Sequence, residues 1–177
     1  KDYNNFILEG GSIESDGKGT ILTTSECLLS ESRNPQFSKT QIEDYLKTTL
    51  GAHRILWLNH GYLAGDDTDS HIDTLARFCN ENTIAYVKCT DPEDEHFEAL
   101  SKMESELKTF TTIEGAPYNL VALPMAEPLF FENERLPATY ANFLIINGAV
   151  LLPYYGSKKD LEAQRILQSV FPEREVI

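Results

Sequence analysis

Along the chain, short apolar runs alternate with longer segments whose apolar residues recur at helical spacing. The runs SIES and GTILTT flank the turn residues DGKG, a pattern typical of a β-hairpin. In the following segment SKTQIEDYLKTTLG, apolar residues recur at helical spacing, namely Ile42, Tyr45, Leu46 and Leu50. Ser38 is placed to cap this helix and Gly51 to end it. HRILWL then predicts a third strand.

The same order of elements recurs twice. IDTLARFC and IAYVKC flank the turn NENT, a helix is predicted within DPEDEHFEALSKMESELKTF, and YNLVALPM closes the unit. ANFLII and AVLLPYY then flank the turn NG, followed by a helix in KKDLEAQRILQSVF and a strand at REVI. The pattern predicts an α/β protein with three strand-strand-helix-strand repeats, at about 6–60, 70–126 and 138–177.

Positions that match between the units support repetition, namely Leu22, Ala85 and Val150 in the second strands, and Ile55, Val121 and Val176 in the last strands. Unrelated α/β proteins also alternate strands and helices, so a simple α/β fold stays open from the pattern alone. Repeated units with incompletely buried faces usually stack or close into a ring. We expect one domain over 1–177.

The net charge of the chain indicates which classes of binding partner are favoured. The chain has 28 acidic and 15 basic residues and a net charge of −13, which disfavours nucleic acids and anionic membranes and favours cationic ligands. The most apolar stretch, FLIINGAVLL, is too short to cross a bilayer, and the first residues do not resemble a signal peptide. The absence of an initial methionine hints at a piece of a longer protein.

The cysteines Cys27, Cys79 and Cys89 are odd in number, and their spacing fits neither a disulfide framework nor a C-x-x-C motif. Each lies among apolar residues. We therefore expect buried, reduced thiols in a cytoplasmic protein.

The most unusual stretch is GDDTDSHID, residues 65–73, which we expect to be a loop entering a strand. A calcium loop of the EF-hand type that starts at Asp67 would need glycine at its sixth position, where Ile72 stands, so that interpretation fails. His71 and Asp73 would share one side of a strand, but one histidine is few ligands for zinc or iron. We predict no metal and no other cofactor.

Two interpretations of this stretch stay open from the residues alone. Alternating carboxylates can hold a guanidinium or ammonium group through charge-assisted hydrogen bonds, and a neighbouring histidine can transfer protons. The simpler alternative is a solvated acidic turn with an incidental histidine.

Three motifs, EGG at 9–11, TSECLLSESRNP at 24–35 and GDDTDSHID at 65–73, together resemble the agmatine deiminase and Porphyromonas-type peptidylarginine deiminase family. This family belongs to the guanidine-modifying, or pentein, superfamily. The resemblance runs from Leu8 to Val176 and implies an incomplete five-bladed α/β propeller, of which this chain supplies three units.

The resemblance also implies residue roles. His71 corresponds to the proton-transfer histidine, Asp73 to the aspartate that binds the guanidinium, and Glu9 to the glutamate that pairs with either. Asp67 corresponds, less directly, to a contact for the far amine of a substrate such as agmatine. For the other acidic residues of the loop we expect turn or capping roles. Without the resemblance, Glu9 would be interpreted as a surface carboxylate beside a glycine turn.

The family's W-x-R-D motif and the cysteine of its G-G-G-N-x-H-C motif have no counterpart here. The resemblance therefore implies a fragment of a deiminase that converts agmatine to N-carbamoylputrescine in putrescine synthesis. Deimination of peptidyl arginine is the alternative activity, and a non-catalytic fragment is the third possibility. A homodimer is expected only by inheritance from the family.

Overall fold

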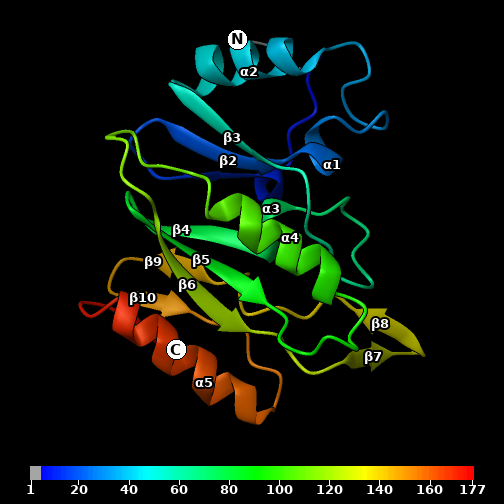
Figure 1. The fold of residues 1–177 in the computed structure, drawn as a ribbon, viewed down its shortest axis with the longest axis vertical. Helices are drawn as coiled ribbons and strands as arrows, with labels where there is room; N and C mark the ends of the chain where they lie inside the picture. Colours follow the sequence, from blue (N-terminus) through cyan, green and yellow to red (C-terminus); the bar gives the residue numbers. More distant parts are fainter. Residues whose placement is uncertain (1–4) are drawn as a thin grey trace.

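The computed structural model describes residues 5–177, in which three small sheets follow one another along the chain (Figure 1). The strands are β1 (Ile13–Ser15), β2 (Thr20–Thr24), β3 (Arg54–Leu58), β4 (Ala76–Asn80), β5 (Thr83–Lys88), β6 (Asn119–Pro124), β7 (Leu129–Phe131), β8 (Glu134–Leu136), β9 (Leu144–Ile146), β10 (Ala149–Leu151) and β11 (Glu175–Val176). The helices are η1 (Gly10–Ser12), α1 (Ser25–Leu28), α2 (Lys39–Leu50), α3 (Ile72–Leu75), α4 (Phe97–Leu107) and α5 (Lys158–Val170).

Each of the three sheets has one antiparallel and one parallel strand pair. The orders are β1-β2-β3, β4-β5-β6 and β9-β10-β11, and in each the middle strand pairs with the first antiparallel and with the last parallel. A parallel pair needs a crossover connection, and α2, α4 and α5 lie within these three crossovers. The predicted mixture of helices and strands is therefore present in this part of the chain.

The alignment of the units is wrong at one position. Ala85 pairs with Val121 and Val150 with Val176, as the matched positions require. Leu22 pairs with Leu56, whereas Ile55 pairs with Ile21. Because side chains alternate along a strand, Ile55 lies on the face of the sheet opposite to that of Leu22 and Leu56. The residue of the first unit that matches Val121 and Val176 is therefore Leu56.

The predicted signals at the ends of α2 are confirmed. Ser38 and Gln41 form a capping box, in which each side chain bonds the other residue's backbone. Gly51 ends the helix with φ of 72°, a left-handed conformation that glycine adopts without a steric cost. The middle helix begins only at Phe97, later than its segment suggested, because residues 91–95 form turns.

The prediction that the acidic segment leads directly into a strand is wrong. Ile72–Leu75 forms the short helix α3, and sheet pairing starts at Ala76, which is opposite Tyr86. Ile72 and Leu75, three positions apart, are both fully buried, so a helical turn places both apolar side chains in the core. Alternation along a strand would have separated them.

Three hydrophobic clusters hold the sheets and helices together. α2 packs on the first sheet through Ile42 and Leu46, and α5 packs on the third sheet through Ala163 and Leu167. The largest cluster joins α3 and α4 to the first and second sheets. α3 is therefore fixed at the junction of two sheets.

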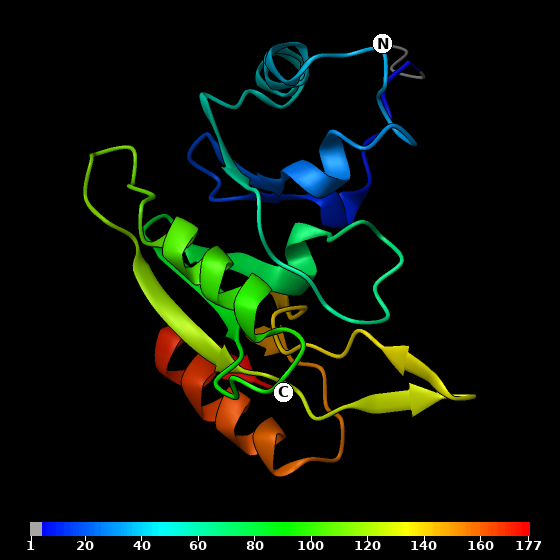
Figure 2. The same cartoon turned by 45° about the vertical axis from the view of Figure 1, so that its right-hand side comes forward.

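The hairpin β7–β8, which the sequence did not predict, projects from the body of the molecule (Figure 2). Its turn residues Glu132 and Asn133 have φ of 49° and 70°, as in the tight turns that connect twisted strands. In the middle of β8, the carbonyl oxygen of Arg135 would lie 2.0 Å from a Cβ on Gly65. The first residue of the acidic segment therefore touches the hairpin backbone.

Within residues 5–177, none of the helices combines the length and apolar character needed to cross a membrane.

The packing of α3 makes its leucine a test of the junction. We expect Leu75→Ala to lower the free energy of unfolding by about 2–5 kcal/mol, because it opens a cavity in the largest cluster. Leu161→Ala in α5 is the matched control, since Leu161 is 52% exposed and its loss should cost less than about 0.5 kcal/mol. Urea denaturation measures both. Equal effects of the two substitutions would contradict this packing.

Candidate active site

The structure brings the glutamate of the EGG motif against the histidine of the acidic segment. Glu9 Oε2 lies 2.6 Å from His71 Nε2, although 62 positions separate the two residues in the chain. Glu9 precedes η1, and its carbonyl accepts hydrogen bonds from the Ser12 amide and hydroxyl. His71 stands immediately before α3, with its side chain only 13% exposed. The pair joins the start of the first unit to the start of the second.

Asp73, in the first turn of α3, lies near His71, because the side chains of both residues pack against Gly11. A Cβ at Gly11 would be 2.5 Å from His71 Nδ1 and 2.7 Å from Asp73 Oδ2, whereas one at Gly10 would meet no atom of residues 5–177 within 4 Å. Gly11 is therefore required for close approach and not only for a turn. Glu9, His71 and Asp73 surround the same small region.

Arg33 is the main site residue that sequence reasoning did not single out. Its side chain, 9% exposed, donates from Nε to Glu9 Oε2 at 2.8 Å. It also donates to Asp69 Oδ2 at 2.5 Å and to the carbonyl of Thr68 at 2.9 Å. Arg33 belongs to the R-N-P part of the second motif, but neither its charge nor its spacing in the sequence indicated these partners.

The neighbouring Asn34 fixes the backbone that carries Glu9. Its side chain is 2% exposed, accepts from the Ile7 amide at 3.0 Å and donates to the Ile7 carbonyl at 2.9 Å. Consecutive residues of the R-N-P motif thus hold the backbone and the side chain of the segment around Glu9.

The acidic segment is folded tightly on itself. Asp66 accepts hydrogen bonds from the Thr68 hydroxyl at 2.5 Å and from the Ser70 amide at 2.7 Å, so its expected turn role is confirmed. Asp69 and Ser70 have φ of 58° and 59°, which is rare for residues other than glycine. Thr24 donates to the Ser70 carbonyl at 2.8 Å and ties this strained turn to the end of β2.

The remaining aspartates of the segment differ. Asp69, expected to be only a turn or cap residue, forms the ion pair with Arg33. Asp67 is exposed, and among residues 5–177 it has no hydrogen-bond or ion-pair partner. The structure therefore leaves Asp67 accessible without bringing it into contact with His71 or Asp73.

The surroundings of Glu9 and Asp73 shift the pKa values of these two carboxyl groups in opposite directions. Hydrogen bonds from His71 and then from Arg33 lower the pKa of Glu9 below its ordinary value. Burial raises the pKa of Asp73, partly offset by the positive charge of Arg77. The guanidinium of Arg77 donates to Glu14 Oε2 at 2.8 Å and also to the Phe143 carbonyl, so it links all three units near Asp73.

The cysteines are free, as predicted, with Cys27 and Cys89 buried but Cys79 only partly covered. Burial raises the pKa of Cys27 and of Cys79 to about 12, so both are thiols at neutral pH. Cys27 Sγ lies 3.9 Å from Glu9 Oε2, the carboxylate oxygen that also contacts His71.

Glu9, Cys27 and His71 have donor atoms within 4.8 Å of one another, close enough to share a metal ion. Their chemistry does not fit one well. Arg33 already donates to the same oxygen of Glu9 and places a positive charge beside it. A metal would also require the Cys27 thiolate, which burial disfavours.

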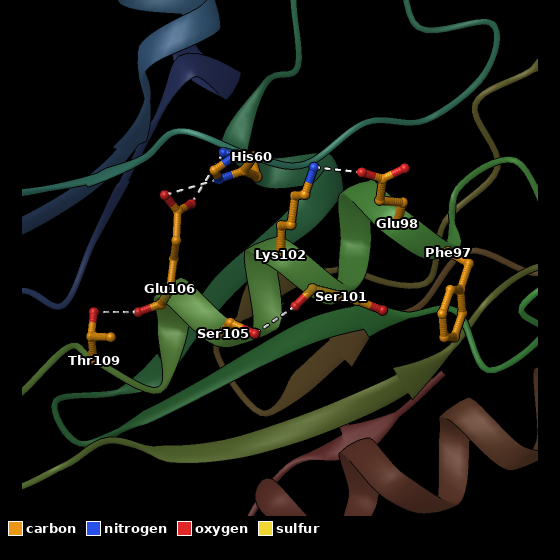
Figure 3. Close-up of a pocket in the computed structure, with 8 residues that line it drawn as sticks. All are labelled: His60, Phe97, Glu98, Ser101, Lys102, Ser105, Glu106 and Thr109. Carbon is orange, nitrogen blue, oxygen red and sulfur yellow. Dashed lines mark hydrogen bonds and ion pairs between the residues drawn. The ribbon is translucent and has the colours of Figure 1, made fainter.

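Two hollows lined by residues within 5–177 lie away from this site. One, of about 540 Å³, runs along the outer face of α4 (Figure 3) and is lined by His60, Phe97, Glu98, Ser101, Lys102, Ser105, Glu106 and Thr109. Its charged residues already pair with each other, His60 with Glu106 and Lys102 with Glu98. The other, of about 590 Å³, is lined by turns at the ends of the first two sheets. Neither contains Glu9, His71 or Asp73.

The close approach at Gly11 yields a direct test of the site's packing. We expect Gly11→Ala to displace the His71 and Asp73 side chains and to destabilise the fold by about 1–3 kcal/mol through overpacking. Gly10→Ala, with open space around its new methyl group, is the control. Chemical denaturation and the imidazole NMR signals of His71 measure the two effects. Unchanged signals in Gly11→Ala would argue against this geometry.

Comparison with known proteins covers the whole chain. The family model of the Porphyromonas-type peptidyl-arginine deiminases matches residues 1–177. An agmatine deiminase of Medicago truncatula is 37% identical over 98% of this chain and 52% of its own length. The chain thus spans about half the length of the curated relatives it matches.

Solved structures agree with these relatives. A Porphyromonas gingivalis protein, provisionally described as an arginine deiminase, is 58% identical with a TM-score of 0.95, over 97% of this chain and 51% of that protein. A cysteine-to-serine variant of the C. jejuni agmatine deiminase, with substrate bound, is 49% identical with a TM-score of 0.91, over 97% and 50%.

The fold extends beyond close relatives. An amidinotransferase of Microseira wollei shares it at a TM-score of 0.55 with 13% sequence identity over 96% of this chain. The match of the family model along the entire chain, and the convergence of the EGG and HID motifs on one site, lead to a single conclusion. The chain belongs to the Porphyromonas-type peptidyl-arginine deiminase family, which includes the agmatine deiminases.

Proposed function

We propose that the protein containing this chain hydrolyses the guanidine group of agmatine to N-carbamoylputrescine and ammonia, a step in putrescine synthesis. The observation that carries the proposal is the contact of Glu9 with His71 beside Asp73, a proton carrier between two carboxyl groups. The names of the relatives at 37% and 49% identity, both agmatine deiminases, support this choice of substrate.

In this proposal the carboxylates of Glu9 and Asp73 hold the planar guanidinium through charge-assisted hydrogen bonds. No partner for Glu9 Oε1 is found among residues 5–177, because its contacts all end on Oε2, so one oxygen is free for a ligand. The exposed Asp67 is suited to the distant ammonium group of agmatine. A fixed cation places the guanidinium carbon for attack.

The proposed reaction has two steps. A cysteine thiolate attacks the guanidinium carbon, the protonated His71 gives its proton to the departing ammonia, and a thiouronium intermediate remains. Neutral His71 then accepts a proton from water, which attacks the same carbon. The adduct expels the thiolate and gives up its hydroxyl proton to the departing ammonia or to solvent, which releases the urea product. Cys27 is not suited to be the nucleophile, because its thiol has a pKa of about 12.

We therefore propose that the nucleophile comes from elsewhere in the full protein, together with the remaining walls of the site. The three sheets would then form part of a five-bladed propeller around this site. On this basis the 177-residue chain alone is a non-catalytic scaffold. A homodimer stays an expectation inherited from the family.

Deimination of peptidyl arginine is the second candidate activity, because the matching family is named for it. The two substrates share the guanidinium and differ at the far end. Asp67 suits an amine, whereas a peptide presents amide groups there.

A substrate comparison separates these functions. We expect the full-length protein to release ammonia from agmatine with a kcat/KM at least about tenfold above that for free arginine or an arginine peptide. Arginine within a peptide offers no ammonium group to Asp67, and free arginine carries, beside its ammonium, a carboxylate that Asp67 repels. Ammonia release and mass spectrometry of the products measure this. Preferential turnover of the peptide would favour the second activity, and no turnover of agmatine would overturn the first.

The contrast between the two residues that contact Glu9 Oε2 tests the assigned roles. In the full-length protein we expect His71→Gln to lower kcat by about 10²–10⁴-fold, the usual contribution of proton transfer by a side chain. We expect Cys27→Ser to stay within about tenfold of the parent, because the buried thiol does not react. Agmatine turnover measures both variants. Loss of the covalent intermediate in Cys27→Ser would refute the exclusion of Cys27.

A further inference from the structure

Arg33 is an unusual residue for a site proposed to bind a cation. Its guanidinium lies among the carboxylates of Glu9 and Asp69, with 9% of the side chain exposed. A fixed positive charge there opposes the binding of a second cation. Its presence therefore calls for a role that outweighs this electrostatic cost.

Burial opposes the charge on Arg33, but hydrogen bonds to Glu9 and Asp69 more than offset this effect and raise the pKa of Arg33. The guanidinium thus remains a charged donor. It reaches Glu9 Oε2, Asp69 Oδ2 and the Thr68 carbonyl at 2.5–2.9 Å. The planar fork of arginine can serve several acceptors at fixed angles, which the single ammonium of lysine cannot.

The contacts of Arg33 determine which oxygen of Glu9 is occupied. Arg33, His71 and Cys27 all approach Oε2, at 2.8, 2.6 and 3.9 Å. Two strong donors on one oxygen prevent the carboxylate from turning. The Glu9 side chain is 42% exposed, and within residues 5–177 the contacts of its carboxylate all end on Oε2, which leaves Oε1 able to accept from a ligand.

The second end of Arg33 holds the segment that carries His71. Thr68 and Asp69 lie three and two positions before the histidine, respectively. Asp69 has a left-handed backbone, a conformation that costs free energy and persists only where surrounding contacts impose it. Arg33 bonds the backbone of Thr68 and the side chain of Asp69, on both sides of the peptide bond that joins them.

We propose that Arg33 is a positioning residue that locks Glu9 Oε2 and the 65–71 segment together, so that Glu9 Oε1 remains directed at the guanidinium of the substrate. The part that concerns the substrate rests on the proposed function. The part that concerns the segment does not. Arg33 touches neither substrate nor reacting atoms and acts through Glu9 and His71.

The test uses the full-length protein with Arg33→Gln and Arg33→Lys. We expect kcat for agmatine to fall about 10–100-fold in both, since charge-assisted hydrogen bonds of this kind contribute that much. We expect amides of residues 66–71 to exchange with deuterium at least about tenfold faster. Asp69→Asn, which removes one charged contact, should produce a smaller change in the same direction.

Arg174→Gln is the matched control. Arg174 donates to the carbonyl of Ile146 in the third unit, so its substitution should change neither kcat nor the exchange of residues 66–71. Unchanged exchange in both Arg33 variants, with circular dichroism like the parent, would overturn the proposal. Higher activity or a lower KM would also overturn it, because Arg33 would then be a competitor of the substrate. If the parent protein turns over no agmatine, the exchange data still judge the role of Arg33 in the segment.

Discussion

One carboxylate oxygen, Glu9 Oε2, connects most of the site. It accepts from His71 in the segment before α3 and from Arg33 in the loop after α1, and the Cys27 thiol approaches it from α1. These donors come from two separate segments, the motif at 24–35 and the acidic segment at 65–73, so the position of Glu9 fixes the two relative to each other. Hydrogen bonds that share one acceptor in this way form a coupled network.

The sheets supply the rigid frame for this connection. α3 is held by the largest hydrophobic cluster, and Thr24 at the end of β2 bonds the turn just before His71. Arg77 joins Glu14 to the Phe143 carbonyl and so links the first, second and third units near Asp73. The hydrophobic packing of α3 and the contacts of Arg77 therefore hold in place the segments that carry the polar residues of the site.

Local signals in the sequence predicted what depends on local interactions. Ser38 and Gly51 define the ends of α2 through contacts within a few residues, and they were correctly predicted. α3 was missed because burial in the tertiary core, and not local pattern, selects the helical turn at Ile72. Arg33 was missed for a related reason: its partners lie 24 and 36 positions away, and charge or spacing alone does not identify them.

The glycines of the site bear on any attempt to transplant it. Gly11 admits His71 and Asp73, and Gly65 admits the backbone of the β7–β8 hairpin, each at distances that a methyl group would prevent. Copying the chemically active side chains onto another scaffold would therefore reproduce only part of the arrangement. A design would also have to specify two places where side-chain atoms are absent, since the shape of the site is set partly by what its backbone leaves out.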